Sequence, residues 1–328
     1  MNRFAKQLLP FSSLIFIISL WTFLVPDTFL SFQNISNVIT RSSVNGIMAA
    51  GMTFIIITSG IDLSVGSMLS ITGMLGAISM LLSGGGTWTG ICSGEFVDMG
   101  VSAMILGTLV GILAGGLCGL FNGICITRLK LAPFIVTLGS MSIFRGISYI
   151  MNDGKPFAIS AYTYLDTGSL LKIPVSIWLL AMVMLGSGFL LKYTKFGRYA
   201  YAIGSNPATA FHAGINVRKI LVIAYTLMGF LTGLAAMIYS SRSSSAQPSA
   251  GLSLELDIVA AVIIGGCSPS GGKGTMTGTL IGTLLISFLR NGLTLLGVST
   301  NLQLVVIGFI IIFAVTADQL AAKTRNNY

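Results

Sequence analysis

The sequence is poor in charged side chains. Only 8% of its 328 residues are Asp, Glu, Lys or Arg, whereas 54% are hydrophobic. An ordinary soluble domain has about 25% charged residues, so this chain cannot present a polar coat to water. We therefore expect an all-α polytopic membrane protein embedded in the lipid bilayer.

The residue types that carry most enzyme chemistry are scarce or isolated. The four cysteines form no C-x-x-C pair, and the single histidine, His212, has no neighbouring pattern typical of a catalytic triad or a metal site. A glycine cluster around Lys273 resembles a phosphate loop, but Cys267 and Gly274 stand where a Walker motif needs Gly and Ser or Thr. We expect no catalytic residue, no metal, no cofactor, and no enzyme activity in this chain.

Basic residues outnumber acidic ones by 18 to 9. They are spread among the loops and are not clustered with aromatic residues, which argues against nucleic-acid binding. Most of them fall in the segments that a cytoplasmic N-terminus would place inside, and cytoplasmic loops are enriched in Lys and Arg. This bias predicts that both the N- and C-termini are cytoplasmic.

Apolar runs divide the chain into about ten candidate transmembrane helices. A span needs about 20 residues, so the shorter runs are expected to be tilted, broken or re-entrant. No small-residue cleavage pattern is evident after the first run, which we expect to be retained as a span. No segment between runs is large enough for a core of its own, so residues 1–328 are predicted to form a single transmembrane domain. The candidate ranges are 10–27, 44–59, 63–83, 101–127, 133–151, 174–191, 220–240, 255–267, 275–291 and 302–319.

One predicted helix carries a regular stripe of glycines. A spacing of four residues places them on one face, where another helix backbone can approach closely. The neighbour is either in the same chain or in a second copy. The helix-packing residues are Gly107, Gly111, Gly115, Gly119 and Gly123.

Two glycine-containing segments break the helical pattern. In the first, Asp62 or Ser64 is expected to cap the following helix, and a proton or pathway role for Asp62 is the alternative. The second contains residues that permit unusual backbone angles between two helices. The helix-break or pathway candidates are Gly60, Asp62, Ser64, Gly66, Gly265, Gly266, Gly271 and Gly272.

Few other ionisable residues fall within the apolar runs. Arg145 and Arg290 lie near predicted outer helix ends, where we expect their side chains to snorkel to the interface. Glu255 and Asp257 begin the eighth run, and acids suit a helix N-terminus. The runs offer Ser, Thr, Asn and Gln in place of buried charge pairs, which favours a small, polar, uncharged substrate.

A polar segment, 192–219, separates two apolar runs and contains five basic residues, no acidic residue and the only histidine. Asn206 and Pro207 form a helix start, residues 208–213 allow about two turns, and Gly214 is expected to end them. Such a helix could bind anionic lipid, but its polar, small-residue surface lacks the Trp, Phe and Leu face of a lipid binder. A protein partner is therefore favoured.

Four long runs resemble the ribose-type permeases of bacterial ABC sugar importers. They are GMTFIIITSGIDLSVGSMLSITG (51–73), GRYAYAIGSNPATAFHAGINVRKI (197–220), SSAQPSAGLSLELDIVAAVIIGGCSPSGGKGTMTGTLIGTLL (244–285) and RNGLTLLGVS (290–299). The likeness extends from about Ser43 to Asp318. Amino-acid permeases share a similar outline.

The resemblance implies a multi-pass subunit of the bacterial inner membrane that translocates a small, ribose-like sugar. Its implied partners are a cytoplasmic ABC ATPase, a periplasmic sugar-binding protein and a second copy of the chain or a paralogous permease. The implied ATPase-coupling residues are Gly204, Ser205, Asn206, Pro207, Ala208, His212, Gly214, Ile215 and Asn216. The alternative is an ion-coupled secondary transporter of a small polar solute, for which only Asp62 is a candidate coupling acid. The resemblance does not name the sugar.

Overall fold

The computed structural model describes residues 3–159 and 162–326, most of which are helical. In chain order the helices are α1 (Arg3–Leu24), α2 (Phe32–Ile57), α3 (Val65–Ser83), α4 (Trp88–Ser93), α5 (Val101–Arg128), α6 (Pro133–Ile150), α7 (Tyr164–Thr167), α8 (Val175–Tyr193), α9 (Lys195–Ser205), α10 (Pro207–His212), α11 (Val217–Ser243), α12 (Leu254–Ile264), α13 (Met276–Leu295) and α14 (Thr300–Asn326). Two-residue strands pair in the connecting segments, β1 (Phe157–Ala158) with β4 (Ser245–Ala246) and β2 (Ser169–Leu170) with β3 (Ile173–Pro174). The predicted all-α class is confirmed.

A helix occupies each of the ten ranges predicted to cross the membrane. Within the described residues six helices, α3, α5, α6, α8, α11 and α13, are long and apolar enough to do so. The helix α12 has 11 residues and a length of about 16 Å, roughly half of the hydrocarbon thickness. The number of helices that span the bilayer therefore remains a prediction.

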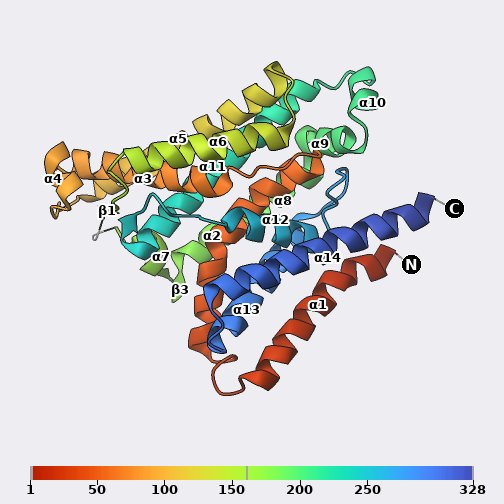
Figure 1. Cartoon of the computed structure of the whole chain (residues 1–328), viewed down its shortest axis with the longest axis horizontal. Coiled ribbons are helices and arrows are strands. Elements are labelled where there is room, and N and C mark those ends of the chain that lie inside the picture. The colour runs from red at the N-terminus through yellow and green to blue at the C-terminus, as the bar shows by residue number, and fades with distance from the viewer. Residues whose placement is uncertain (1–2, 160–161, 327–328) are drawn as a thin grey trace.

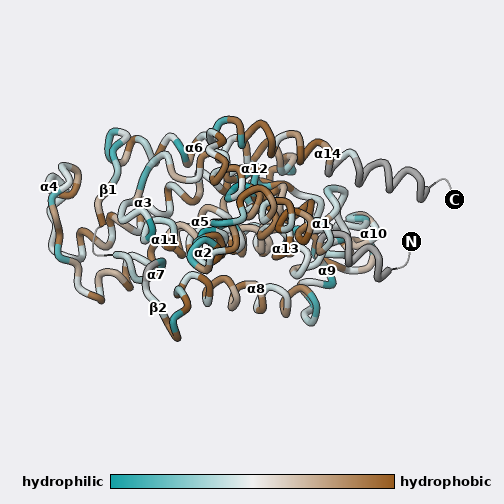
Figure 2. The backbone as a smooth tube through the Cα atoms, turned by 90° about the horizontal axis from the view of Figure 1, so that it is seen from below, coloured by the Kyte–Doolittle hydropathy of each residue, from teal (hydrophilic) through white to brown (hydrophobic). Residues whose placement is uncertain are grey.

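The helices form two groups that meet at α2 (Figure 1). The helices α3, α5, α6 and α11 lie roughly along one another, and α1, α13 and α14 form the other group. The beginning of α1 and the end of α14 lie at the same end of the molecule as α9 and α10, whereas α4 lies at the opposite end. Figure 2 shows hydrophobic residues along the lengths of the long helices and hydrophilic residues mainly in the connections.

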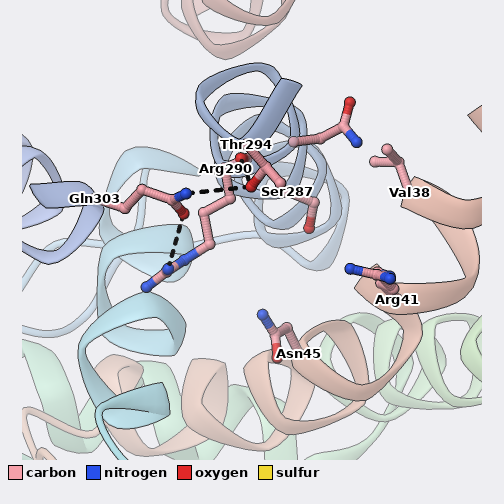
Figure 3. A pocket seen from close by; sticks show the side chains of 8 residues that line it. Val38, Arg41, Asn45, Ser287, Arg290, Thr294 and Gln303 are labelled. Carbon is pink, nitrogen blue, oxygen red and sulfur yellow. Dashed lines mark hydrogen bonds between the residues drawn. The ribbon is translucent and has the colours of Figure 1, made fainter. Parts of the chain in front are cut away.

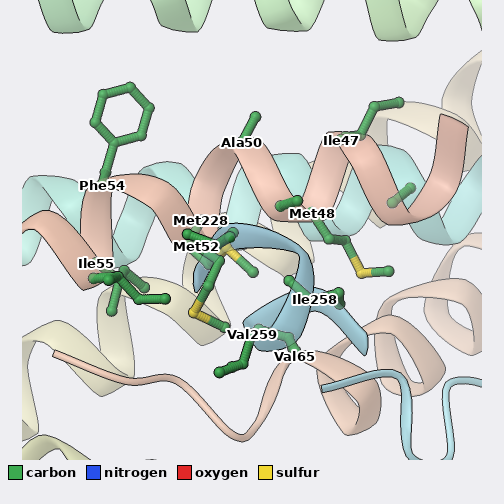
Figure 4. Close-up of a cluster of buried hydrophobic side chains, with 14 of the residues drawn as sticks. Ile47, Met48, Ala50, Met52, Phe54, Ile55, Val65, Met228, Ile258 and Val259 are labelled. Atoms are coloured by element: carbon green, nitrogen blue, oxygen red, sulfur yellow. The ribbon is translucent and has the colours of Figure 1, made fainter. Parts of the chain in front are cut away.

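The helix α2 forms the centre of the fold. Nearly every residue from Ser42 to Ile57 is buried, because α8, α9, α11, α12 and α13 all contact this helix. Met48 and Met52 point towards α12, and Met52 lies near Met228 of α11 (Figure 4). A helix that is buried on every side packs against protein and not lipid.

The helix α5 has two different faces. Its glycine stripe lies against α3 and α11 of the same chain. A Cβ added at Gly115 would overlap the carbonyl oxygen of Gly229 and lie 2.9 Å from the Gly233 nitrogen, and one at Gly119 would overlap the carbonyl oxygen of Tyr225. The opposite face exposes large apolar side chains such as Leu109, Leu113 and Leu117, as expected for a surface in contact with lipid.

Candidate functional site: the α9–α10 junction and a polar pocket

The segment between α8 and α11 folds into two short helices. Thr194 caps α9 by accepting a hydrogen bond from the Gly197 nitrogen, and Asn206 caps α10 by accepting one from the Thr209 nitrogen at 3.0 Å. Pro207 occupies the first turn of α10, and Gly214 follows the helix with a φ of +81°. The helix predicted from the Asn-Pro start and the glycine stop is thus present.

One side of α10 packs against the rest of the protein, and the other side is exposed. Ala210 is buried against Ile203 and Ile220, whereas Ser205 to Thr209 and Phe211 to Gly214 are exposed. The expectation that this surface lacks large apolar groups was wrong at one position, because the side chain of Phe211 is 67% exposed and contacts the ring of His212. The exposed surface therefore combines small polar groups with a single aromatic side chain.

The end of α9 meets two other chain segments at a contact that we call the junction, formed by residues 57–59, 201–205 and 270–274. The Gly272 nitrogen donates a hydrogen bond to the Ile57 carbonyl oxygen at 2.9 Å. The Ser59 hydroxyl donates to the carbonyl oxygens of Gly204 (3.2 Å) and Ser270 (3.0 Å). The junction ties α9 to the end of α2 and to the loop between α12 and α13.

Gly204 allows this close approach. A Cβ added at Gly204 would overlap the Ile57 carbonyl oxygen and lie 2.5 Å from the Gly272 nitrogen, so a larger residue would separate the segments. The Tyr201 hydroxyl also donates to the Gly274 carbonyl oxygen at 2.7 Å. Burial raises the pKa of Tyr201 to about 12, so the phenol remains a hydrogen-bond donor at cellular pH.

The loop between α12 and α13 needs its glycines for conformation and for packing. Gly266, Gly271 and Gly272 have φ values of +93°, +83° and +69°, which other residues rarely adopt. Gly265 packs directly on Gly278 of α13, where a Cβ on either residue would overlap the other's carbonyl oxygen. Cys267 in the same loop is buried, and its sulfur lies 3.9 Å from the Thr279 hydroxyl.

Asp62 lies in the break between α2 and α3 and is completely buried. Its Oδ1 atom accepts hydrogen bonds from the Ser64 nitrogen (2.9 Å) and the Ser64 hydroxyl (2.6 Å), and Asn122 Nδ2 donates to that hydroxyl at 2.9 Å. Ser64 occupies the predicted N-cap position of α3, but neither its side chain nor that of Asp62 accepts a hydrogen bond from the first turn of the helix. Asp62 Oδ2, Asn122 Oδ1 and the Tyr225 hydroxyl have no hydrogen-bond partner among the described residues.

We expect the Asp62 carboxylate to matter as a hydrogen-bond acceptor and not as a charge. The variant Asp62→Ala would leave the Ser64 nitrogen and hydroxyl without their acceptor and should lower the free energy of unfolding by about 2–3 kcal/mol. The variant Asp62→Asn keeps an acceptor at this position, and Asp62 has no ion-pair partner in the described ranges, so the change should alter stability by less than about 1 kcal/mol. Thermal unfolding of the purified proteins in detergent tests this, and equal destabilisation by both variants would contradict it.

Two arginines turn inward, contrary to the expectation that they snorkel. Arg145 of α6 donates to the carbonyl oxygens of Pro248 and Ala250, each at 2.7 Å. Arg290 of α13 lies beside Asp257 of α12, with Nε–Oδ2 at 2.7 Å and Nη2–Oδ1 at 2.8 Å. The expectation of no buried charge pairs was therefore wrong, because Asp257 neutralises an arginine on the neighbouring helix instead of only beginning its own.

A polar pocket lies between α2, α13 and α14, near the end of α2 that is remote from the junction (Figure 3). Its volume is about 260 Å³. Figure 3 shows Arg41 and Asn45 of α2 facing Ser287, Arg290 and Thr294 of α13. The sequence analysis did not identify this pocket, because its polar residues come from helices more than 240 positions apart.

The structure brings together only part of the predicted residue set. Gly204, Ser205, Gly271 and Gly272 meet at the junction, where Ser59 and Tyr201 join them. Within the described chain, α10 packs against α9 and α11, and its other side is exposed. Gly66 lies elsewhere, against the carbonyl oxygen of Gly251.

Comparison with known proteins places these features in a family. Residues 34–315 match the family described as the branched-chain amino acid transport system / permease component. The chain is 42% identical to the ribose import permease protein of Haemophilus influenzae over 97% of its length and 94% of that protein. It is 42% identical to the ribose import permease protein of Bacillus subtilis (96% and 93% covered) and 36% identical to the D-allose transport system permease protein of Escherichia coli (95% and 91% covered). No solved structure matches the chain.

Proposed function

Because the chain belongs to the family of branched-chain amino acid transport system permease components, we infer that it is the membrane-spanning subunit of an ABC importer for a small sugar. The observation that carries this inference is its identity of 36–42%, over nearly the whole chain, to permeases named for ribose and D-allose. It is a multi-pass protein of the inner membrane. The transported molecule is a ribose-like monosaccharide.

We propose that α9 and α10 couple the permease to a separate ATPase subunit. The exposed side of α10, from Asn206 to Gly214, is available to enter a cleft in a partner, and Ala210 holds the helix on the body of the protein. The junction would then convey a displacement of α9 to α2 and to the α12–α13 loop. A cytoplasmic position for α9 and α10 also agrees with the predicted cytoplasmic termini, which share their end of the molecule.

The remaining features of the proposal concern the assembly. Residues 1–328 would form one domain with about ten membrane-crossing helices, and α12 would be the broken one because it has only 11 residues. A periplasmic binding protein would deliver the sugar to the end of the permease remote from α10. A second copy of the chain is expected to complete the importer, since a closed two-fold assembly is the commonest oligomer.

Reconstitution tests the function. Proteoliposomes that contain this chain, its ATPase and its sugar-binding protein should take up radiolabelled ribose or allose only with ATP inside and the binding protein outside. Liposomes with the permease alone should accumulate no sugar under a proton or sodium gradient. Uptake by the permease alone under an ion gradient would instead support a secondary transporter.

A further inference from the structure

The polar pocket between α2, α13 and α14 has one wall that is already fixed by hydrogen bonds. Arg290 is held by Asp257, and its Nη1 atom lies 3.4 Å from the Gln303 side-chain oxygen. Gln303 Nε2 in turn donates to the Thr294 hydroxyl (3.2 Å) and to the Val298 carbonyl oxygen (3.0 Å), as Figure 3 shows in part. These groups keep fixed positions without a ligand.

The opposite wall carries polar groups without a partner. Within the described chain, no hydrogen bond or ion pair joins the side chain of Arg41 or of Asn45 to another residue, although both line the pocket. Arg41 is exposed and Asn45 is half-buried. The pocket thus offers free hydrogen-bonding groups opposite a pre-organised wall.

The pocket lies near the end of α2 that is remote from the junction. Arg41 lies 16 residues before Ile57, or about 24 Å along α2, and three residues before the predicted span 44–59. This position agrees with the proposed delivery of the sugar at the end of the permease remote from α10.

The chemistry of the lining selects the class of ligand. Arg41 can only donate hydrogen bonds, while the Asn45 amide can both donate and accept. The hydroxyls of Ser287 and Thr294 donate to the carbonyl oxygens of Thr283 and Arg290 and can accept a hydrogen bond from a ligand. Sugar hydroxyls also donate and accept, so they can match both kinds of partner. The volume of about 260 Å³ lies just below the usual range for ligand clefts, about 300–1,000 Å³, which fits a monosaccharide better than a longer sugar.

We propose that this pocket contacts the sugar after its release from the binding protein. Arg41 and Asn45 would form hydrogen bonds with the sugar hydroxyls. Arg290 acts as a positioning residue, since Asp257 and Gln303 fix its guanidinium. The proposal rests on the sugar-importer function inferred above and adds to it the residues that meet the substrate.

The test uses the complete importer in proteoliposomes with radiolabelled ribose. The variants Asn45→Ala and Arg41→Met each lose a side chain that bonds to the sugar and should lower ribose uptake about ten-fold. ATP hydrolysis stimulated by the loaded binding protein should change less than about two-fold. Fewer sugars would then enter per ATP hydrolysed, whereas a defect in docking would lower ATP hydrolysis together with uptake. The matched control is Asn37→Ala, an exposed amide on the same helix outside the pocket, which should leave both rates unchanged.

The outcomes separate the two proposals. If the wild-type complex imports neither ribose nor allose, the inferred function fails and the sugar pocket fails with it. If the wild type imports ribose and both pocket variants match it, only the pocket is overturned. If a variant fails to assemble with the ATPase, Asn45→Cys provides a second measurement. Ribose-loaded binding protein should slow the labelling of this cysteine by a membrane-impermeant maleimide, and labelling of the wild-type chain measures the background. Labelling that is not slowed would overturn the pocket.

Discussion

Replacing Ala208 with arginine should abolish ATP-driven sugar uptake. Ala208 is exposed on the first turn of α10, between the Asn206 cap and the buried Ala210 that anchors the helix. A long charged side chain there would not disturb the folding of α10 but would prevent its exposed side from entering a fitted cleft, since overpacking a complementary contact is destabilising. Uptake should fall at least about 100-fold, as expected for about 3 kcal/mol of lost contact energy.

The matched variant is Ala208→Ser, which keeps a small side chain and should retain nearly normal uptake. Co-purification of the ATPase with each variant shows whether binding or a later step is lost. Normal uptake by Ala208→Arg would mean that α10 does not contact the ATPase, and the coupling proposal would have to be abandoned. Equal loss in both variants would point to a role of the alanine in folding.

Adding a single methyl group at a glycine should have opposite effects in α5 and in α8. In Gly115→Ala the new Cβ would overlap the Gly229 carbonyl oxygen, and because the obstacle is backbone, α5 and α11 would have to move apart. We expect a loss of about 2–3 kcal/mol of stability and a lower yield of folded protein.

The control for this variant is Gly186→Ala in α8, where no atom lies within 4 Å of the added Cβ. Alanine is favoured over glycine in a helix by about 1 kcal/mol, so this variant should be as stable as the wild type or more so. Thermal unfolding in detergent compares the two. Destabilisation of the same size in both would show that the close approach of α5 and α11 does not govern the Gly115 result.

The helices and the local turns could be predicted from the sequence because their signals are local. Apolar runs mark each long helix, and Asn206, Pro207 and Gly214 mark the two ends of α10 within nine residues. The four-residue spacing of the α5 glycines likewise indicates a packing face without a knowledge of the neighbour.

The polar contacts could not be predicted, because each depends on segments that are distant in the sequence. Arg290 has no acid nearby on α13, and its partner Asp257 lies on α12. Arg145 binds carbonyl oxygens, which carry no sequence signal at all. The junction joins residues near 58, 204 and 271, where Gly204 allows a close backbone approach and Gly272 adopts a positive φ.

The helices α2 and α13 both extend from the junction to the polar pocket. Both reach the junction, α2 with its last residue, Ile57, and α13 with its first, Met276, just after Gly274. Both also line the polar pocket, α2 at Arg41 and Asn45 and α13 at Ser287 and Thr294. A helix resists bending, so a displacement of α2 relative to α13 at the junction would also change the width of the pocket between them. Under the proposed coupling, the pocket would then open or close in step with ATP without a separate relay of side chains.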